Sequence, residues 1–168
     1  MHREDFKSWM FRTLMNMYPM FFGTGGKIMF LSSDYKKATL RLKLNMWTYN
    51  YVGTIFGGSQ FSALDPFHMV LLLKIIGKEY VVLDKAGSIQ FKKPGKGKLL
   101  ATIEYTDAEI EEIKARAHKE GRFELVRTTH WHNEQGEVVS TMEKTLYIAT
   151  KEYFANRKKA ANPHLTGS

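Results

Sequence analysis

Apolar side chains near the start of the chain recur with a helical period. The stripe consists of Phe6, Trp9, Met10, Thr13, Leu14 and Met17, and it ends just before Pro19. Residues three and four apart share one face of a helix, and a proline ends a helical pattern. The pattern therefore predicts an amphipathic N-terminal helix that covers an edge or a face of a sheet, with its stripe as part of the core rather than a cofactor site.

A period of two then predicts a β-hairpin. From Ala38 to Met46, apolar side chains alternate with Thr, Arg, Lys and Asn, which is typical of a strand with one face in solvent. Residues 27–32 form a plausible partner strand, and residues 32–34 supply turn-forming serines and an aspartate. We therefore expect the first two strands to pair with each other.

Four more β-rich segments predict four more strands. Residues 80–92 and 98–105 lie on either side of the turn KPGKG. Residues 122–132 and 137–149 flank the turn Asn-Glu-Gln-Gly, whose glycine tolerates a positive φ angle. The chain therefore contains six predicted strands.

Two further helices are predicted between these strands. Gly57 and Gly58 begin a segment, to residue 76, that is apolar on nearly every helical face, as expected for a helix enclosed on all sides. Residues 107–119 follow a capping box formed by Thr106 and a glutamate three residues later, and a glycine ends this helix. The first of these helices is a core element, and the second lies on the surface.

A helix that is apolar on all sides requires a sheet curved around it, which indicates an α+β protein of the hot-dog architecture. We expect an antiparallel sheet of about six strands to wrap a long central helix (about 57–76), with a further helix at the N-terminus. No repeat or linker divides the chain. Residues 1–150 are therefore predicted to form one domain, and residues 151–168 a basic, loosely ordered tail.

Composition narrows the possible chemistry. The chain has 168 residues, of which 43% are hydrophobic and 25% charged, as in a globular protein with one core. It contains no cysteine, which excludes disulfides, thiolate nucleophiles and cysteine-ligated metals. Charges interrupt the apolar N-terminus, so a signal peptide is not expected, and we predict a cytoplasmic protein. The longest apolar run, 67–76, is half the length of a membrane span, so no membrane partner is predicted.

Most of the net charge of +8 comes from two places. One is the basic tail, and the other is a turn that contains Lys92, Lys93, Lys96 and Lys98. These lysines either bind the phosphates of coenzyme A or of a phosphopantetheine carrier, or they keep an edge strand soluble. Nucleic acid is not a predicted partner, because aromatic residues do not alternate with the basic ones. The glycine turn GTGGK at 23–27 lacks the spacing and the Ser or Thr of a phosphate-binding loop, so we reject that motif.

Asp65 is the most unusual residue of the apolar helical segment. A buried carboxylate costs several kcal/mol unless it is paired, and Asp65 stands directly before Pro66. One interpretation gives Asp65 a functional role on a long helix. The other makes Asp65 only the N-cap of a helix that begins at Pro66, because proline inside a helix costs about 3 kcal/mol.

Three phrases of the sequence resemble a known protein family. They are YVGTIFGGSQFSALDPFHM at 51–69, YVVLDKAGSIQFKKPG at 80–95 and EKTLYIATK at 143–151. They are similar to a branch of the hot-dog superfamily that is described as a domain of unknown function. That branch is distantly similar to acyl-CoA thioesterases of the phenylacetyl-CoA type. The resemblance covers roughly residues 10–150.

The resemblance implies a set of site residues. Such thioesterases use an Asn, then His-Gly-Gly, then an acidic residue on the central helix, and this chain has Asn50, Phe56-Gly57-Gly58 and Asp65 in the matching places. The resemblance implies that backbone N–H groups of Gly57 to Ser59 polarise the thioester carbonyl. The acidic residue, often from the partner subunit, acts as general base or nucleophile. Phe56 replaces the histidine, which puts turnover in doubt.

Further residues are implied to contact the substrate. Asp84 falls where the thioesterases place a polar site residue, and the pair Asp84-Lys85 is typical of the branch. The implied substrate-binding set is Phe56, Ser59, Gln60, Asp84, Lys85, Lys92 and Lys93. The glycines also have a purely structural reading, as positions of close packing, and Asn50 can be an ordinary turn residue.

Histidines offer two weaker candidates. His68 is one helical turn after Asp65 and is either its acid–base partner or a core histidine. His130, His132 and Glu134 resemble a metal set, but exposed histidines on a strand are commoner and no third ligand at helical spacing supports the set, so we predict no metal and no cofactor. The sequence thus predicts an acyl-thioester hydrolase that is a homodimer or a tetramer, with its site at the dimer interface. The alternatives are a non-catalytic binder of acyl or apolar ligands and, less well supported, a dehydratase-like protein.

Overall fold

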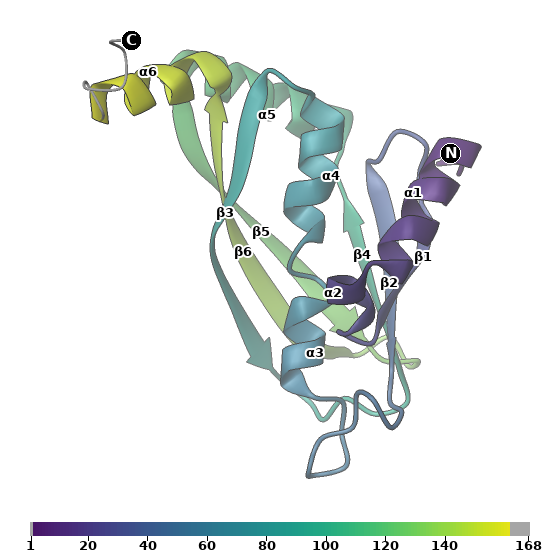
Figure 1. Cartoon of the computed structure of the whole chain (residues 1–168). Helices are drawn as coiled ribbons and strands as arrows, with labels where there is room; N and C mark the ends of the chain where they lie inside the picture. The colour runs from purple at the N-terminus through teal and green to yellow at the C-terminus, as the bar shows by residue number, and fades with distance from the viewer. Residues whose placement is uncertain (1, 162–168) are drawn as a thin grey trace.

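A computed structural model describes residues 2–161 and shows a curved antiparallel sheet with helices packed on one of its faces (Figure 1). Its strands are β1 (Gly26–Leu31), β2 (Lys37–Lys43), β3 (Tyr80–Phe91), β4 (Lys98–Glu104), β5 (Arg122–His132) and β6 (Val138–Thr150). Its helices are α1 (Phe6–Met17), α2 (Pro19–Phe22), α3 (Gly57–Ser62), α4 (Phe67–Ile76), α5 (Asp107–Glu120) and α6 (Lys151–Ala161). The predicted α+β class, six-stranded antiparallel sheet and N-terminal helix are confirmed.

The strands are ordered β1-β2-β4-β5-β6-β3 across the sheet. β1 pairs with β2 and β5 pairs with β6, each pair joined by a short connection. β3 and β4 follow each other in sequence but are not neighbours, because β3 pairs with β6 at the edge while β4 pairs with β2. The segment KPGKG therefore carries the chain from an edge of the sheet to its middle.

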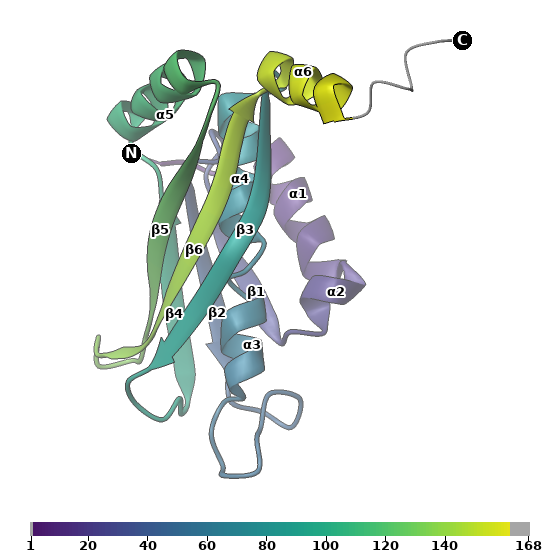
Figure 2. The same ribbon diagram turned by 90° about the vertical axis from the view of Figure 1, so that its left-hand side faces the viewer.

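The concave face of the sheet holds the core. Leu40, Leu99, Trp131 and Leu146 are fully buried in the core, and α3 and α4 lie along this side of the sheet (Figure 2). The indole N–H of Trp131 donates to the Gln60 carbonyl at 2.8 Å, which ties α3 to β5. The alternation of these strands, seen in the sequence, thus fixes which face of the sheet receives the central helices.

The predicted central helix 57–76 is present as two helices. α3 ends at Ser62, α4 begins at Phe67, and residues 63–66 form a turn between them. Helical bonding reaches Asp65, whose N–H donates to the Phe61 carbonyl at 3.0 Å. Pro66 has no N–H to continue the pattern, so the chain bends at this point.

α1 lies along the free edge of β1. The Asn16 amide donates to the Ile28 carbonyl at 3.0 Å and accepts from the Ile28 N–H at 2.8 Å, so it replaces a neighbouring strand. This contact turns Phe11 and Met15 toward the core and leaves the predicted stripe facing solvent. The prediction that the stripe is core was wrong, because polar pairing with β1 sets the rotation of the helix.

The remaining helices lie at one end of the sheet. α5 begins with the predicted capping box, in which Thr106 and Glu109 bond to each other's backbone N–H groups. α6 occupies the first part of the segment predicted to be a loose tail, and residues 162–168 lie outside the described part of the chain. The assignment of residues 1–150 to one domain stays a prediction.

Candidate active site

Asp65 lies at the bend between α3 and α4, and it is paired rather than free. Its Oδ1 accepts a hydrogen bond from Lys144 Nζ at 2.5 Å, and its side chain is 38% exposed. α4 has no side-chain cap bond, so Asp65 does not act as the capping residue of that helix. Of the two interpretations of Asp65, the structure disfavours the N-cap.

Lys144 lies in the middle of β6 and bridges two carboxylates. Its side chain is 4% exposed, and its Nζ lies 2.5 Å from Asp65 Oδ1 and 3.1 Å from Asp84 Oδ2. Burying an ammonium group is costly unless opposite charges and hydrogen bonds compensate. Both aspartates supply that compensation, and the three groups together carry a net charge of −1.

A β-bulge in β3 brings Asp84 to this cluster. The pairing with β6 shifts register between Asp84 and Ala86, so Lys85 is the extra residue. Val82 is buried and faces the core, and Asp84 shares its face because alternate residues of a strand point the same way. Beyond the bulge, Gly87 takes the inward position opposite Lys144 in the register. The bulge therefore turns both an acid and a glycine toward the helices.

Burial raises the pKa of Asp84 above its ordinary value, while the hydrogen bond from Lys144 opposes this rise. The neighbouring Asp65 carboxylate is a further, smaller cause that raises the pKa of Asp84. Two carboxylates at one site commonly hold protons differently. The cluster thus has the composition of an acid–base centre.

Lys85 lies apart from the cluster. Its ammonium forms an ion pair with Glu124 of β5, a residue opposite Tyr147 in the register of β5 and β6. Tyr147 alternates with the inward Leu146, so this ion pair lies on the convex face of the sheet. The structure does not bring Lys85 together with Asp65, and its substrate-binding role stays a prediction.

A cavity of about 460 Å³ opens at the other end of α3. It is lined by predicted site residues together with others of the same region, among them Asn50, Gly57, Gln60, Phe91, Lys92 and Lys93. The structure thus brings together, in one hollow, five residues that the sequence singled out from three separate segments. β3 joins this cavity to the acid cluster, because Phe91 lies beside Gly57 and Asp84 lies beside Lys144.

Close packing accounts for both glycines at the start of α3. A Cβ atom on Gly57 would lie 2.6 Å from the Phe91 ring, and one on Gly58 would lie 2.3 Å from the Phe56 ring. The N–H groups of residues 57–59 have no hydrogen-bond acceptor among the described residues, and no side chain caps the helix. The structural reading of the glycines is therefore correct, and the donors needed for an oxyanion are also present.

Asn50 and Gln60 both stabilise the local structure. Asn50 accepts from the N–H of Thr54 at 2.9 Å and donates to the Thr54 hydroxyl at 2.9 Å, which closes the loop before α3. Gln60 is 3% exposed, donates to the Ile55 carbonyl and accepts from the Ser140 hydroxyl. Their main contacts are within the protein, so their roles toward a substrate stay predictions.

The two remaining candidates at the start of α3 differ in exposure. Phe56, at the place of the expected histidine, is 55% exposed and covers Gly58. Ser59 is buried, and its carbonyl accepts from the Ala63 N–H. Among the described residues, the Ser59 hydroxyl forms no side-chain hydrogen bond to the Asp65–Lys144–Asp84 cluster, and the Phe56 ring has no polar atom with which to form one.

His68 is a core histidine rather than a partner of Asp65. It is 1% exposed, and its ring nitrogens hydrogen-bond with the Tyr105 hydroxyl at 3.2 Å and the Thr129 hydroxyl at 2.7 Å. Burial, with smaller contributions from Arg127 and Lys144, lowers the pKa of His68 to about 3. The imidazole is therefore neutral at physiological pH and cannot act as a general acid for the site.

The lysine turn is partly neutralised. Lys93 pairs with Glu137 at 2.5 Å and Lys98 pairs with Glu134 at 2.9 Å, both across the turn that joins β5 to β6. Lys92 forms no ion pair with any residue in the range 2–161, and it lines the cavity. Of the four lysines, Lys92 is thus the one best placed to meet an anionic ligand there.

No metal cluster appears in the described part of the chain. In the weak candidate set of His130, His132 and Glu134, His130 bonds with the Thr141 hydroxyl at 2.9 Å and Glu134 pairs with Lys98 at 2.9 Å, so two of the three side chains already have partners. Among the described residues, no three His, Asp or Glu side chains form a metal-binding group. No helix of that part is long and apolar enough to span a bilayer.

Lys144 is the central residue that sequence reasoning missed. A signal was present, because Met142, Lys144, Leu146 and Ile148 alternate with more polar residues and so share the inward face of their strand. A lysine on such a face needs an anionic partner, and Asp65 and Asp84 were already identified.

The chain matches a known protein family over most of its length. A family model described as "Domain of unknown function (DUF4442)" matches residues 7–148. No curated protein matches the chain. The six-stranded antiparallel sheet and its similarity to solved structures confirm the predicted hot-dog fold.

Solved structures show the same fold at low sequence identity. A Pseudomonas aeruginosa protein of unknown function, described as "Probable Thioesterase", has a TM-score of 0.73 and 19% identity, over 84% of this chain and 95% of that one. A Haemophilus influenzae thioesterase has a TM-score of 0.63 and 12% identity, over 89% and 94% of the two chains. A hypothetical Streptococcus pneumoniae thioesterase, solved with coenzyme A, has a TM-score of 0.53 and 18% identity, over 74% and 86%.

Proposed function

Because the chain belongs to the family described as "Domain of unknown function (DUF4442)", and because its fold is that of hot-dog thioesterases, we propose that it hydrolyses an acyl thioester. The observation that carries this proposal is the Asp65–Lys144–Asp84 cluster, with one buried ammonium between two partly exposed carboxylates. A buried ion cluster of this kind is costly, and it is common where chemistry requires it. The substrate is an acyl-CoA or an acyl-carrier thioester.

Asp65 acts as general base or nucleophile in this proposal. As a base, its carboxylate takes a proton from water while the water oxygen bonds to the thioester carbon. The C–S bond then breaks, and the proton passes to the leaving thiolate, so that a carboxylic acid and a free thiol result. Lys144 fixes the position of the Asp65 carboxylate by its 2.5 Å hydrogen bond, and Asp84 balances the charge of Lys144.

The separation between Asp65 and the start of α3 supports a site shared between two subunits. Asp65 follows Gly57 by eight residues, about 12 Å along a helix, whereas one carbonyl must meet the base and the oxyanion donors within about 3 Å. A single chain therefore cannot apply both groups to one thioester. A homodimer in which Asp65 of one subunit faces residues 57–59 of the other removes this difficulty.

β3 is the edge through which such a dimer is proposed to form. It is a twelve-residue strand at the end of the sheet, and most of its residues from Leu83 to Phe91 are exposed. A long unpaired edge strand tends to pair with another chain. Pairing of two β3 strands would bring together the acid cluster and the cavity at the start of α3, both of which lie beside β3.

Lys92 and the neighbouring cavity are proposed to hold the phosphate-bearing part of the thiol. The cavity of about 460 Å³ is lined by polar Asn50 and Gln60, apolar Phe91 and the unpaired Lys92. The Streptococcus pneumoniae neighbour that was solved with coenzyme A makes this ligand class a reasonable one to test.

A ligand-binding protein without turnover is the second candidate. Phe56 stands where the resemblance expects histidine, and its half-exposed ring covers the start of α3. An apolar ring there can close a binding tunnel but cannot orient a water molecule. On this reading the cluster is a remnant that still shapes the pocket.

Hydrolysis of a panel of acyl-CoAs, from short to long and aromatic, separates these candidates. Release of free thiol is followed with a chromogenic thiol reagent, and binding is measured in parallel by calorimetry with each acyl-CoA. Thiol release from at least one member supports the hydrolase. Tight binding without release from any member supports the ligand-binding protein, and neither binding nor release contradicts both.

A further inference from the structure

The face of α1 that was predicted to be core is instead an open apolar surface. Its five residues are 45% to 72% exposed, and they are Phe6, Trp9, Met10, Leu14 and Met17. At 100° per residue they surround Thr13 on the side of the helix opposite Phe11 and Met15. A contiguous apolar patch of this kind marks an interaction surface more often than chance exposure does.

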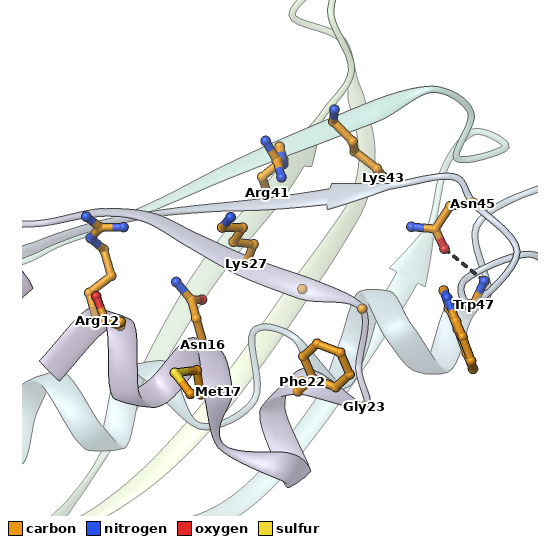
Figure 3. Close-up of a pocket in the computed structure, with 13 residues that line it drawn as sticks. Arg12, Asn16, Met17, Phe22, Gly23, Lys27, Arg41, Lys43, Asn45 and Trp47 are labelled. Carbon is orange, nitrogen blue, oxygen red and sulfur yellow. Dashed lines mark hydrogen bonds between the residues drawn. The ribbon is translucent and has the colours of Figure 1, made fainter. Parts of the chain in front are cut away.

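The patch continues onto α2 and the segment after β2. Tyr18, Met20 and Phe22 are 54% to 75% exposed, and Met46 and Trp47 are both 85% exposed. Met17, Phe22 and Trp47 form part of the wall of a cavity of about 700 Å³ (Figure 3). We call these apolar residues and the cavity beside them the α1–α2 surface.

Three cations line this cavity from the neighbouring strands. Lys27 of β1 stands directly opposite Arg41 of β2, and Lys43 lies two residues further on the same face (Figure 3). Like charges directly opposite each other destabilise a sheet. None of the three forms an ion pair within the described residues, whereas Arg12 on α1 is neutralised by Glu4 at 2.7 Å. No acidic side chain of the described residues therefore neutralises the three cations that line this cavity.

The surrounding chain is strongly basic. Residues 6–64 contain seven cations, of which Arg12, Lys36 and Lys37 form ion pairs with Glu4, Asp107 and Glu104. The other four form no ion pair within the described residues, and they are Lys7, Lys27, Arg41 and Lys43. The charge of the α1–α2 surface favours an anionic partner over a second copy of itself, because two such surfaces repel each other.

We propose that the α1–α2 surface binds an anionic phospholipid bilayer, with a lipid phosphate in the cavity and the apolar stripe at the level of the headgroups. Exposed Trp, Phe and Leu beside Lys and Arg are typical of elements that lie in a membrane interface without crossing it. Aromatic side chains with one polar end favour that interface. The sequence predicted no membrane partner because no segment can span a bilayer, and surface binding has no such requirement.

Side chains, rather than the glycine turn, hold the phosphate in this proposal. The N–H groups of Gly23, Thr24 and Gly25 bond to carbonyls of α2, and that of Gly26 bonds to the Thr24 hydroxyl. The turn therefore offers no free cradle of N–H groups, in agreement with the rejection of a phosphate loop. Gly25 instead allows the turn to approach Thr48, which a Cβ atom would meet at 2.2 Å.

The test is co-sedimentation of the full chain with vesicles of phosphatidylglycerol and phosphatidylcholine, compared with pure phosphatidylcholine vesicles. We expect binding to the anionic vesicles, and we expect salt to weaken it, because salt screens surface charge. Each cation near an anionic surface contributes roughly fivefold in affinity, so Arg41→Gln with Lys43→Gln should reduce binding by an order of magnitude or more. Phe6→Ser with Phe22→Ser should also reduce it, because both apolar rings are then lost.

The control variants carry substitutions of the same kind, loss of positive charge or loss of an exposed apolar side chain, on other faces of the protein. Lys114→Gln with Lys119→Gln on α5, and Val126→Ser on β5, should leave vesicle binding within twofold of the wild type. Four outcomes overturn the proposal, and three of them concern binding. They are no binding to anionic vesicles, equal losses in the control variants, and binding of inorganic phosphate or a soluble anionic amphiphile without any binding to vesicles. Conversion of a dimer to a monomer by the Phe6 and Phe22 changes, without loss of vesicle binding, would also overturn it and identify a subunit interface.

Discussion

The ammonium of Lys144 and the two aspartates around it determine the chemistry of the candidate site. The lysine is almost fully buried, and each aspartate keeps about a third of its side chain in solvent. The cluster therefore combines a fixed internal charge with carboxylates that a substrate can reach. A cluster that served packing alone would not need its acids at the surface.

Lys144→Met tests the internal charge. The substitution keeps the length of the side chain but leaves Asp65 and Asp84 facing each other without a cation, and we expect it to lower the free energy of unfolding by about 2 kcal/mol. Urea unfolding measures this change. Adding Asp84→Asn to Lys144→Met should recover part of the loss, because it removes the repulsion. An unchanged midpoint in Lys144→Met would show that the ion pairs are not formed.

His68 gives the folded protein a definite pH dependence. Its pKa is lowered to about 3 by burial, against 6.5 for an ordinary histidine, so between these values the unfolded chain binds the extra proton. The stability from this group is complete above pH 6.5 and falls as the pH decreases toward 3, by about 1.4 kcal/mol per pH unit. His68→Gln cannot titrate, so its stability should depend less steeply on pH over pH 4–6. Parallel pH profiles of unfolding for the two proteins would contradict the prediction.

At the scale of the elements, the contact between α1 and β1 is the one that sequence patterns described least well. Asn16 bonds to both backbone groups of Ile28 and closes the free edge of the sheet. A side-chain amide that replaces a strand leaves no periodic signal, so the rotation of α1 could not be read from its apolar stripe. The same contact exposes the stripe that forms the α1–α2 surface.

Asn16→Ala should destabilise the protein by about 1–2 kcal/mol, because one N–H and one C=O of β1 lose their partners. Hydrogen exchange at Ile28 should accelerate at the same time. Thr13→Ala, one turn earlier on the solvent side of α1, is the matched control and should change the free energy of unfolding by less than about 0.5 kcal/mol. Slow exchange at Ile28 in Asn16→Ala would mean that another group closes the edge.

Periodicity and turn residues predicted the six strands and the pairing of β1 with β2 and of β5 with β6, whereas α6 and the places of β3 and β4 in the sheet could not be predicted. Strands 80–92 and 98–105 were located to within a residue or two of β3 and β4, but their placement at the edge and in the middle of the sheet depends on long-range pairing. The bulge at Lys85 was likewise invisible, although it decides that Asp84 faces the helices and Lys85 does not. The bend at residues 63–66 had a visible cause in Pro66.

For the candidate site, too, single residues could be recognised from the sequence, whereas the contacts between them could not. Asp65 was recognised as an acid in an apolar segment and Asp84 through the resemblance, and the structure joins them through Lys144, which the alternation of β6 could have revealed. Asn50 was recognised through the resemblance, Gly57 through the start of the apolar helix and Lys92 through the charge distribution, and the three line one cavity. Local hydrogen bonds explain Asn50 and Gln60 without a substrate, and a sequence pattern cannot distinguish such contacts from functional ones.

At the scale of the whole molecule, the acids and the start of α3 are too far apart along one chain to act on the same bond. Two inactive variants can test whether two chains share the site. Asp65→Asn removes the acid, and Ser59→Pro removes a free N–H in the first turn of α3, where proline is tolerated, without the clash with Phe91 that a side chain on Gly57 would cause. If the site is shared, mixing and refolding the two variants together should restore activity that neither has alone. A mixture as inactive as its components would contradict a shared site.

The central claim is that Asp65 is the catalytic group of a thioesterase, and thiol release by Asp65→Asn on the most active acyl-CoA tests it most directly. The matched control is Glu143→Gln, which neutralises an exposed acid next to Lys144 on the opposite face of β6. We predict that turnover falls by about 10²-fold or more in Asp65→Asn, the scale expected for loss of a general base, while Glu143→Gln and the unfolding midpoints change little. Unchanged turnover in a folded Asp65→Asn protein would contradict the account.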